Sequence, residues 1–201
     1  MKTKLSGKKI AILVADGFEQ VELTSPKETL EKAGAQTQII SPSEKTVKGW
    51  DESKWAKVVR VDVPLKRAKA EDYDALVLPG GVMNPDKLRR NEKALEFVRS
   101  FFDERKPVAA ICHGPWTLID AGVIRGRKVT SYHSIQTDLK NAGAEWVDEP
   151  VVVDKGLVTS RKPGDLPAFN RKMVEEFSKG FQDHVPSSMY SEPAMAGSGV
   201  D

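Results

Sequence analysis

Residues 107–115 read P-V-A-A-I-C-H-G-P, an apolar run that changes abruptly into a turn. The run over 107–111 is typical of a strand buried on both faces, as in parallel sheets covered by helices. We expect a helix from Pro115 to about Ala121, ended by Gly122. The pattern therefore predicts a sharp strand-to-helix turn that holds Cys112 clear of the sheet.

Further strands and helices are expected on both sides of this turn. Buried strands are predicted over 9–15, 37–41 and 75–79, a strand pair over 46–63 with its turn at 49–51, a strand over 129–132 and a hairpin over 151–160. Helices are predicted over 25–33, with Ser25 as N-cap and Pro26 in the first turn, and over 91–104, 134–141 and 165–179. This alternation predicts an α/β fold with a mostly parallel sheet between helices.

The length of 201 residues suits one domain, which we place at 1–182. Residues 183–201 are rich in Ser, Pro and Gly without periodicity, and they predict a flexible tail. Lys and Arg number 31 against 29 Asp and Glu, a net charge of +2, which argues against nucleic acid or an acidic membrane surface as the main partner.

The single cysteine cannot form an intramolecular disulfide. No apolar stretch follows the basic N-terminus, and no run approaches the roughly 18 apolar residues of a membrane span. We therefore expect a cytoplasmic protein without a membrane partner.

Three polar segments follow predicted strands and meet at the carboxyl end of the sheet, where α/β folds bind ligands. They are D-G-F-E-Q-V-E at 16–22, G-G-V-M-N-P-D at 80–86 and C-H-G-P at 112–115. A cysteine at a helix N-terminus is favoured as thiolate, the nucleophilic form. Cys112 is therefore the candidate nucleophile, although a lone cysteine is more often an inert core residue.

The neighbouring residues each allow two interpretations. His113 is either a base or only the donor of a backbone N–H to an anion hole. Gly80 and Gly81 either end the strand in a tight turn or direct a backbone N–H at developing negative charge. Glu19 and Glu22 are either surface acids or partners that share a proton with the thiol, provided that burial raises the carboxyl pKa.

Other site classes lack their motifs in this chain. The three histidines show no metal-ligand spacing, and no P-loop, G-x-G-x-x-G after the first strand or G-x-S-x-G is present. We therefore expect neither a metal nor another cofactor, and no serine hydrolase.

Six segments together resemble the PfpI family, which belongs to the superfamily of protein deglycases and class I glutamine amidotransferase-like domains. The resemblance covers residues 8 to about 178. It rests on D-G-F-E-Q-V-E (16–22), D-A-L-V-L-P-G-G (74–81), P-V-A-A-I-C-H-G-P (107–115), G-R-K-V-T-S-Y (126–132), N-A-G-A-E-W-V-D (141–148) and V-V-V-D-K-G-L-V-T-S-R (151–161).

The resemblance implies a flavodoxin-like three-layer sandwich with Cys112 on a nucleophile elbow. It further implies that Glu22 hydrogen-bonds the sulfur with Glu19 nearby, and that the N–H groups of Gly81 and His113 form an oxyanion hole. Tyr132 and Arg161 would line the pocket. A homodimer or higher homo-oligomer is implied, in which Asp86, at a shifted position, would orient the histidine of a neighbouring subunit.

The activity implied by the resemblance is a cysteine-dependent hydrolase of stress defence. Its substrates would be small aldehydes such as methylglyoxal and glyoxal, or their adducts on proteins and peptides. Two alternatives remain, an oligomeric cysteine peptidase and a non-enzymatic redox sensor or holdase that uses oxidation of Cys112. Trp50 and Trp55 depart from the family pattern and form either an assembly contact or packing beneath a longer hairpin.

Overall fold

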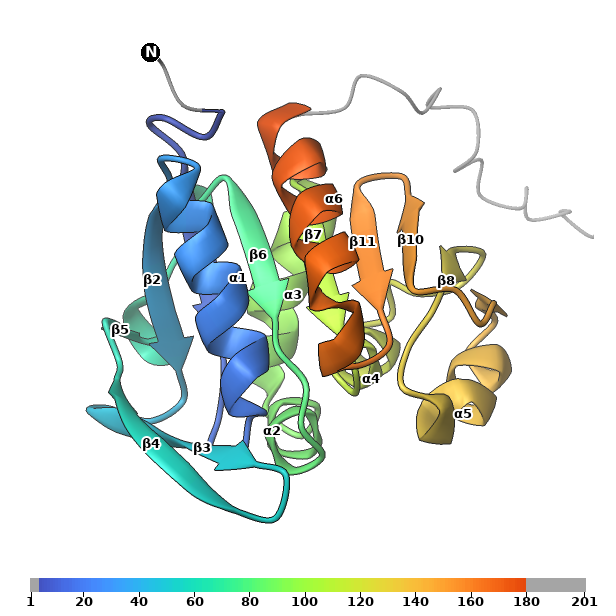
Figure 1. Cartoon of the computed structure of the whole chain (residues 1–201), viewed down its shortest axis with the longest axis horizontal. Helices are drawn as coiled ribbons and strands as arrows, with labels where there is room; N and C mark the ends of the chain where they lie inside the picture. The colour runs from blue at the N-terminus through green and yellow to red at the C-terminus, as the bar shows by residue number, and fades with distance from the viewer. Residues whose placement is uncertain (1–3, 180–201) are drawn as a thin grey trace, which may run out of the picture.

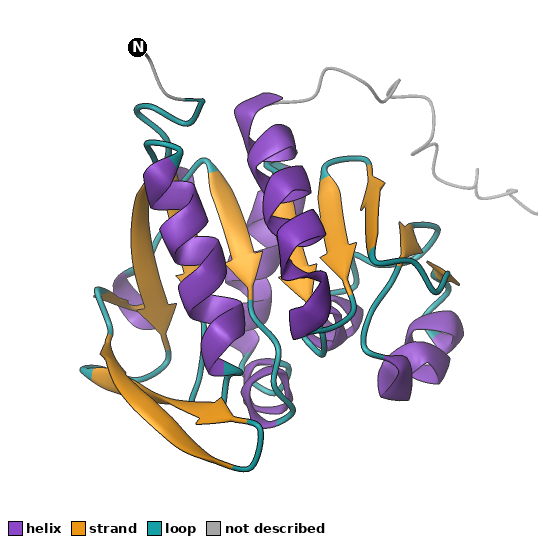
Figure 2. Ribbon diagram, viewed as in Figure 1, coloured by secondary structure: helices purple, strands orange, loops and turns teal. Residues whose placement is uncertain are grey.

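The computed structural model describes residues 4–179, which form a seven-stranded sheet between two layers of helices (Figures 1 and 2). All neighbouring strands of the sheet are parallel except β10 and β11. Across the sheet the order is β10 (Val151–Asp154), β11 (Leu157–Ser160), β7 (Val108–Ile111), β6 (Ala75–Leu78), β1 (Lys9–Leu13), β2 (Gln36–Ser41) and β5 (Val63–Pro64).

Two helices cover one face of the sheet, α1 (Gln20–Lys32) and α6 (Leu166–Lys179), and lie in front in Figure 1. The other face is covered by α3 (Glu92–Asp103), with α2 (Met83–Leu88), α4 (Pro115–Asp120) and α5 (Gln136–Asn141) adding side chains to the same core. The predicted α/β sandwich with a mostly parallel sheet is confirmed.

Short elements complete the described chain. β3 (Thr46–Asp51) and β4 (Lys54–Arg60) form a separate antiparallel hairpin, and β8 (Lys128–Val129) pairs in parallel with β9 (Glu145–Trp146). Four single 3-10 turns lie at Leu65–Arg67, Ala70–Asp72, His133–Ile135 and Pro163–Asp165. Among residues 4–179, no helix is long and apolar enough to cross a membrane.

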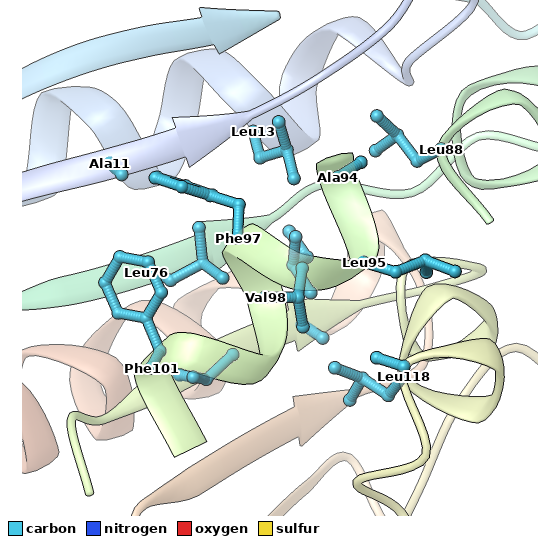
Figure 3. Close-up of a cluster of buried hydrophobic side chains, with 14 of the residues drawn as sticks. Ala11, Leu13, Leu76, Leu88, Ala94, Leu95, Phe97, Val98, Phe101 and Leu118 are labelled. Carbon is cyan, nitrogen blue, oxygen red and sulfur yellow. The ribbon is translucent and has the colours of Figure 1, made fainter. Parts of the chain in front are cut away.

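The central strands are buried because both of their faces carry apolar residues. In β1, Ile10 and Ile12 face the core under α1 and α6, whereas Ala11 and Leu13 face the core under α3. On the α3 side, Phe97 and Phe101 stack edge to face with ring centroids 5.2 Å apart (Figure 3). Asn91 begins α3, its side chain accepting the Ala94 N–H as an N-cap. These two cores fix the positions of the strand ends.

The strand order reverses between β1 and β6. The chain passes from β1 outward to β2 and β5, then returns to the other side of β1 with β6 and continues to β7 and β11. In open α/β sheets ligands bind beyond the carboxyl ends of the strands at such a reversal. The three polar segments singled out from the sequence follow β1, β6 and β7, which are neighbours in the sheet.

The first helix begins five residues earlier than the predicted 25–33 start, at Gln20 rather than Ser25. Pro26 lies inside this helix, not in its first turn, and costs one backbone hydrogen bond to the Glu22 carbonyl. The early start is supported by tertiary contacts, since Glu22 and Leu23 are buried and the Gly80 N–H donates to the Glu22 carboxyl. The helix start predicted from Ser25 and Pro26 is therefore wrong, because these contacts stabilise an additional turn before Pro26.

Two other boundaries differ from the prediction. The turn expected at 49–51 lies instead at 52–53, between β3 and β4. Gly49 continues β3 at a point where the Gln20 side chain leaves no space for a Cβ. The strand expected over 129–132 ends at Val129, since Thr130 N–H donates to the Thr159 hydroxyl instead of continuing a ladder. Helix α2 was not predicted. The predicted tail over 183–201 lies outside the described residues.

Candidate active site

Cys112 lies between β7 and α4 with a backbone φ of +61°. This left-handed conformation is uncommon for a residue with a side chain and is held by neighbouring backbone. The Cys112 N–H donates to Ser160 O at 3.0 Å, and Cys112 O accepts the Tyr132 N–H at 2.9 Å. The side chain is 7% exposed and lies at the base of a cavity. The sharp strand-to-helix turn predicted from residues 107–115 is therefore present, with Cys112 in a left-handed conformation.

Glu22 reaches the same point from the first turn of α1 and is completely buried. Its Oε2 accepts the Gly80 N–H at 2.9 Å, and its Oε1 has no hydrogen-bond partner among residues 4–179. The carboxyl also interacts with the Cys112 thiol. Burial is the main cause that raises the pKa of Glu22 to about 8, against the lowering effect of the Gly80 N–H. Glu22 therefore holds or exchanges a proton at neutral pH.

The thiol and the carboxyl titrate together. Burial and the neighbouring Glu22 charge raise the pKa of the Cys112 thiol, whereas hydrogen bonds from the backbone N–H groups of Gly81 and His113 lower it. Because each charge disfavours the other, loss of the first proton leaves one negative charge and one proton shared by the pair. When the sulfur forms a bond to the substrate it can no longer hold the shared proton, so the proton is then on Glu22.

Gly80 lies between these two side chains. A Cβ at this position would lie 2.6 Å from Cys112 Cβ and 2.7 Å from Glu22 Oε2. Real side-chain carbons do not approach so closely. A glycine is therefore required for the carboxyl and the thiol to face each other, and its N–H is left to bind the carboxyl.

His113 is held by contacts on both ring nitrogens. Nδ1 lies 3.2 Å from Cys112 Sγ, and Nε2 lies 3.0 Å from Ser134 Oγ. The ring stacks on Tyr132 with centroids 4.7 Å apart. Burial, together with the nearby charge of His133, lowers the pKa of His113 to about 4. The ring is therefore neutral at pH 7 and can accept or donate a proton.

The cavity over Cys112 has a volume of about 580 Å³. Five of the predicted site residues line it together with Cys112: Glu19, Glu22, Gly81, His113 and Tyr132. Gly80 lies just beneath, between Cys112 and Glu22. The structure places these residues together, and their catalytic roles stay a prediction. The sequence left open whether Glu19 or Glu22 contacts the thiol, and in the structure Glu22 interacts with it.

Two predicted residues lie elsewhere. Arg161 is not among the cavity-lining residues, because its guanidinium pairs with Asp165 at 2.9 Å and Asp148 at 2.7 Å. These two carboxylates draw it away from the pocket that the resemblance implied. Asp86 is exposed on α2, and it does not line the cavity of this chain. Its contact with a histidine of another subunit stays a prediction.

The hairpin of β3 and β4 supplies part of the wall. Trp50 N–H donates to Phe18 O at 2.7 Å, and Glu19 pairs with Trp50 as an isolated parallel bridge. These bonds place Trp50 and Glu52 at the cavity. The Trp55 ring lies edge to face against Trp50, with centroids 5.4 Å apart, and is 47% exposed.

Sequence reasoning missed two further residues. Ser134 contacts His113 from the 3-10 turn that begins at His133, and its place in the chain carried no signal. Asn84 is completely buried and joins two loops, since its amide donates to Pro79 O and Gly80 O while its Oδ1 accepts the Ala15 N–H. Its only signal was an amide residue shortly after Gly80-Gly81.

Residues 8–176 match the model of the DJ-1/PfpI family. Protein/nucleic acid deglycase 2 of Escherichia coli is 50% identical over 169 residues, covering 83% of this chain and 96% of that protein. Putative cysteine protease YraA of Bacillus subtilis is 46% identical over 168 residues, covering 83% of this chain and 96% of that protein.

A solved structure shares the arrangement of elements. The crystal structure of Drosophila melanogaster DJ-1beta matches with a TM-score of 0.77 and 30% identity, covering 85% of this chain and 90% of that one. The sheet order, the strained cysteine after β7 and the sequence matches therefore agree: this chain belongs to the DJ-1/PfpI family.

Proposed function

We propose that this protein is a cysteine-dependent hydrolase that releases lactate from methylglyoxal adducts of amino-acid side chains. The observation that carries the proposal is the buried pair of Cys112 and Glu22 at the base of the cavity, with two backbone N–H groups directed at the sulfur. The name deglycase borne by a relative 50% identical to this chain supports the same chemistry.

The reaction begins with attack of the Cys112 sulfur on the aldehyde-derived carbon of the adduct. The bond from this carbon to the nitrogen or sulfur of the modified side chain breaks, and the proton on Glu22 moves to that leaving atom. The amino acid is released, and the three-carbon unit remains on Cys112 as a hemithioacetal. Glu22 is left as a carboxylate.

The second stage converts the hemithioacetal into a thioester. The hydrogen on the first carbon moves to the second through an enediol, and the hydroxyl proton passes between the two oxygens. Glu22 and the neutral ring of His113 are the proton carriers within reach of the sulfur. Carbon is oxidised at one position and reduced at the next, so no external oxidant is required.

Water then hydrolyses the thioester. The oxygen that becomes negatively charged during this attack is bonded to the carbon on Cys112, close to the N–H groups of Gly81 and His113. Preorganised donors of this kind stabilise such a charge. Lactate leaves, the sulfur recovers its electron pair, and the pair with Glu22 regains its shared proton.

The size and charge of the cavity favour adducts over the free aldehyde and over nucleic acid. Methylglyoxal is a three-carbon molecule, whereas the cavity, with a volume of about 580 Å³, is in the size range of pockets that hold drug-sized ligands. The remaining space suits the side chain that carries the adduct. Three carboxyl groups, those of Glu19, Glu22 and Glu52, line it, which opposes a polyanion.

A Cys112→Ala variant tests this function. We expect it to lose lactate release from methylglyoxal-treated Nα-acetylarginine amide while retaining the far-UV circular dichroism and the thermal unfolding midpoint of the wild type. Ser178→Ala, an exposed hydroxyl change on α6, serves as the control and should keep full activity. Lactate release that survives in the Cys112→Ala variant would refute the proposal.

A further inference from the structure

A group of acidic side chains stands at the mouth of the active-site cavity, on the hairpin and the loop before α1. Glu19 and Glu52 line the cavity, and Asp51 lies beside them at the end of β3. We call these three residues the carboxylate rim. Glu19 and Trp50 pair as an isolated parallel bridge, which holds the two rim segments together. Like charges placed this close favour the binding of a cation between them.

Among residues 4–179, neither a lysine nor an arginine lines the cavity beside the rim. Lys54 is exposed and stands opposite Asp51 in the β3–β4 register, outside the cavity lining. The other two lysines near the rim segments are engaged elsewhere: Lys48 Nζ lies over the Trp55 ring at 5.5 Å, and Lys87 Nζ donates to Asp16 O at 3.3 Å. The carboxylates of Glu19 and Glu52 therefore make the field inside the cavity negative.

Two further observations point to a ligand. Glu22 is completely buried and lines the cavity, and its Oε1 has no hydrogen-bond partner among residues 4–179. The indole of Trp50 forms part of the wall between Glu19 and Glu52, and its Nε1 donates to Glu52 O at 2.9 Å, which fixes the ring against the rim. An aromatic ring beside carboxylates is the usual setting for a guanidinium, which stacks on the ring and hydrogen-bonds the carboxylates.

We propose that the carboxylate rim and Trp50 select arginine-derived adducts over neutral or anionic ones. This inference rests on the function proposed above, because it names the substrate class of the same cavity. The guanidinium keeps its positive charge when one nitrogen adds to an aldehyde. The adduct and the released arginine therefore both carry the positive charge that the carboxylate rim would bind. Burial and the charges of Asp51 and Glu52 raise the pKa of Glu19, and a bound cation relieves that repulsion.

Binding to the inactive enzyme tests the rim without turnover. Nα-acetylarginine amide and Nα-acetylcitrulline amide have nearly the same shape and differ by one positive charge. In the Cys112→Ala protein, titration calorimetry should show arginine amide binding roughly tenfold more tightly than citrulline amide, as expected for about two partly solvated carboxylates. Raising the ionic strength should narrow the difference.

The variants Glu19→Gln and Glu52→Gln, combined in the Cys112→Ala background, should remove most of this preference. Glu71→Gln combined with Asp72→Asn makes the same change in net charge in the 3-10 turn before β6, at the opposite end of that strand from the cavity, and should leave the preference unchanged. Equal binding of the two amides, binding of neither at millimolar concentration, or a preference that survives the combined variant would each overturn the proposal.

Turnover separates this inference from the proposed function. In the active protein, the ratio of kcat/KM for the arginine-amide adduct to that for the adduct of Nα-acetylcysteine amide should fall about tenfold in the combined variant, mainly through KM. If the wild type releases no lactate from either adduct, the proposed function is refuted. The calorimetric comparison of the two amides then still tests whether the carboxylate rim prefers the positive charge. An unchanged ratio refutes the rim alone.

Discussion

The Glu22 carboxyl and the Cys112 thiol face each other beside Gly80, in the space that a side chain at this position would fill. A Cβ there would lie 2.6 Å from Cys112 Cβ and 2.7 Å from Ile111 O. The carboxyl comes from the helix after β1, the glycine follows β6 and the thiol follows β7. Three neighbouring strand ends thus build one proton-sharing pair, and the predictions below concern what this arrangement does.

A Gly80→Ala variant should lose activity. The added methyl group must push apart the Cys112 backbone and the Glu22 carboxyl, which we expect to cost about 1–3 kcal/mol of unfolding free energy and to lower kcat/KM by roughly 100-fold. Urea unfolding and lactate release measure the two effects. The matched control is Gly164→Ala, where an added Cβ meets nothing within 4 Å. Wild-type activity in Gly80→Ala would contradict the geometry described here.

The rate should depend on the shared proton. With the pKa of Glu22 raised to about 8, the reactive pair that has lost one proton becomes dominant as the pH rises through that value. We expect kcat/KM for lactate release to increase with pH up to about 8 and then to level off. His113, with its pKa lowered to about 4, should add no step between pH 5 and 7.

Glu22→Gln should abolish that pH step. Glutamine keeps an acceptor for the Gly80 N–H but cannot take up a proton, so kcat/KM should fall by roughly 100-fold or more. The pH dependence that remains should reflect the thiol alone. An unchanged profile in Glu22→Gln would show that Glu22 does not carry the proton.

The same ionisation links stability to pH. Because the pKa of Glu22 is raised from 4.5 to about 8, the folded protein holds more protons there than the unfolded chain, and stability falls as the pH rises between these values. His113 acts oppositely below 6.5, since its pKa is lowered from 6.5 to about 4. Between pH 6.5 and 8 the Glu22 effect should dominate, at up to about 1.4 kcal/mol per pH unit.

Urea titrations at several pH values measure this slope. The wild type should lose unfolding free energy relative to Glu22→Gln across pH 6.5 to 8. If the unfolding free energies of the two proteins change with pH in parallel, the pKa of the Glu22 carboxyl is not raised in the folded protein.

Asn84 should matter for both stability and rate. Asn84→Leu keeps the branched outline of the side chain but removes the hydrogen bonds to Ala15, Pro79 and Gly80, leaving buried backbone groups unpaired. We expect a loss of about 2–4 kcal/mol of unfolding free energy together with lower kcat/KM, since Gly80 is no longer held. Asn141→Leu, an exposed change at the end of α5, should stay within about 0.5 kcal/mol of wild type.

Periodicity and turn residues predicted the sheet, most helices and the grouping of Glu22, Gly80 and Cys112, because strand ends that share an edge are fixed by topology. Local signals failed where tertiary contacts prevailed. Pro26 marked a helix start, yet the buried Glu22 extends the helix ahead of it. The placement of Trp50 depends on pairing with Glu19, a contact between distant segments that no local pattern encodes.

Arg161 and Ser134 show the same limit inside the site. The resemblance placed Arg161 in the pocket, but Asp148 and Asp165 hold its guanidinium elsewhere. Ser134 reaches His113 because the chain turns at 133–135, which brings its hydroxyl to the ring. Side-chain partners of this kind require the packed structure.

The central claim is that Cys112 carries the three-carbon unit during turnover, and peptide mass spectrometry of rapidly quenched reactions tests it most directly. With methylglyoxal-modified Nα-acetylarginine amide as substrate, the peptide containing Cys112 should gain the mass of one methylglyoxal during the steady state and lose it once substrate is exhausted. Turnover without any transient adduct on Cys112 would contradict the account.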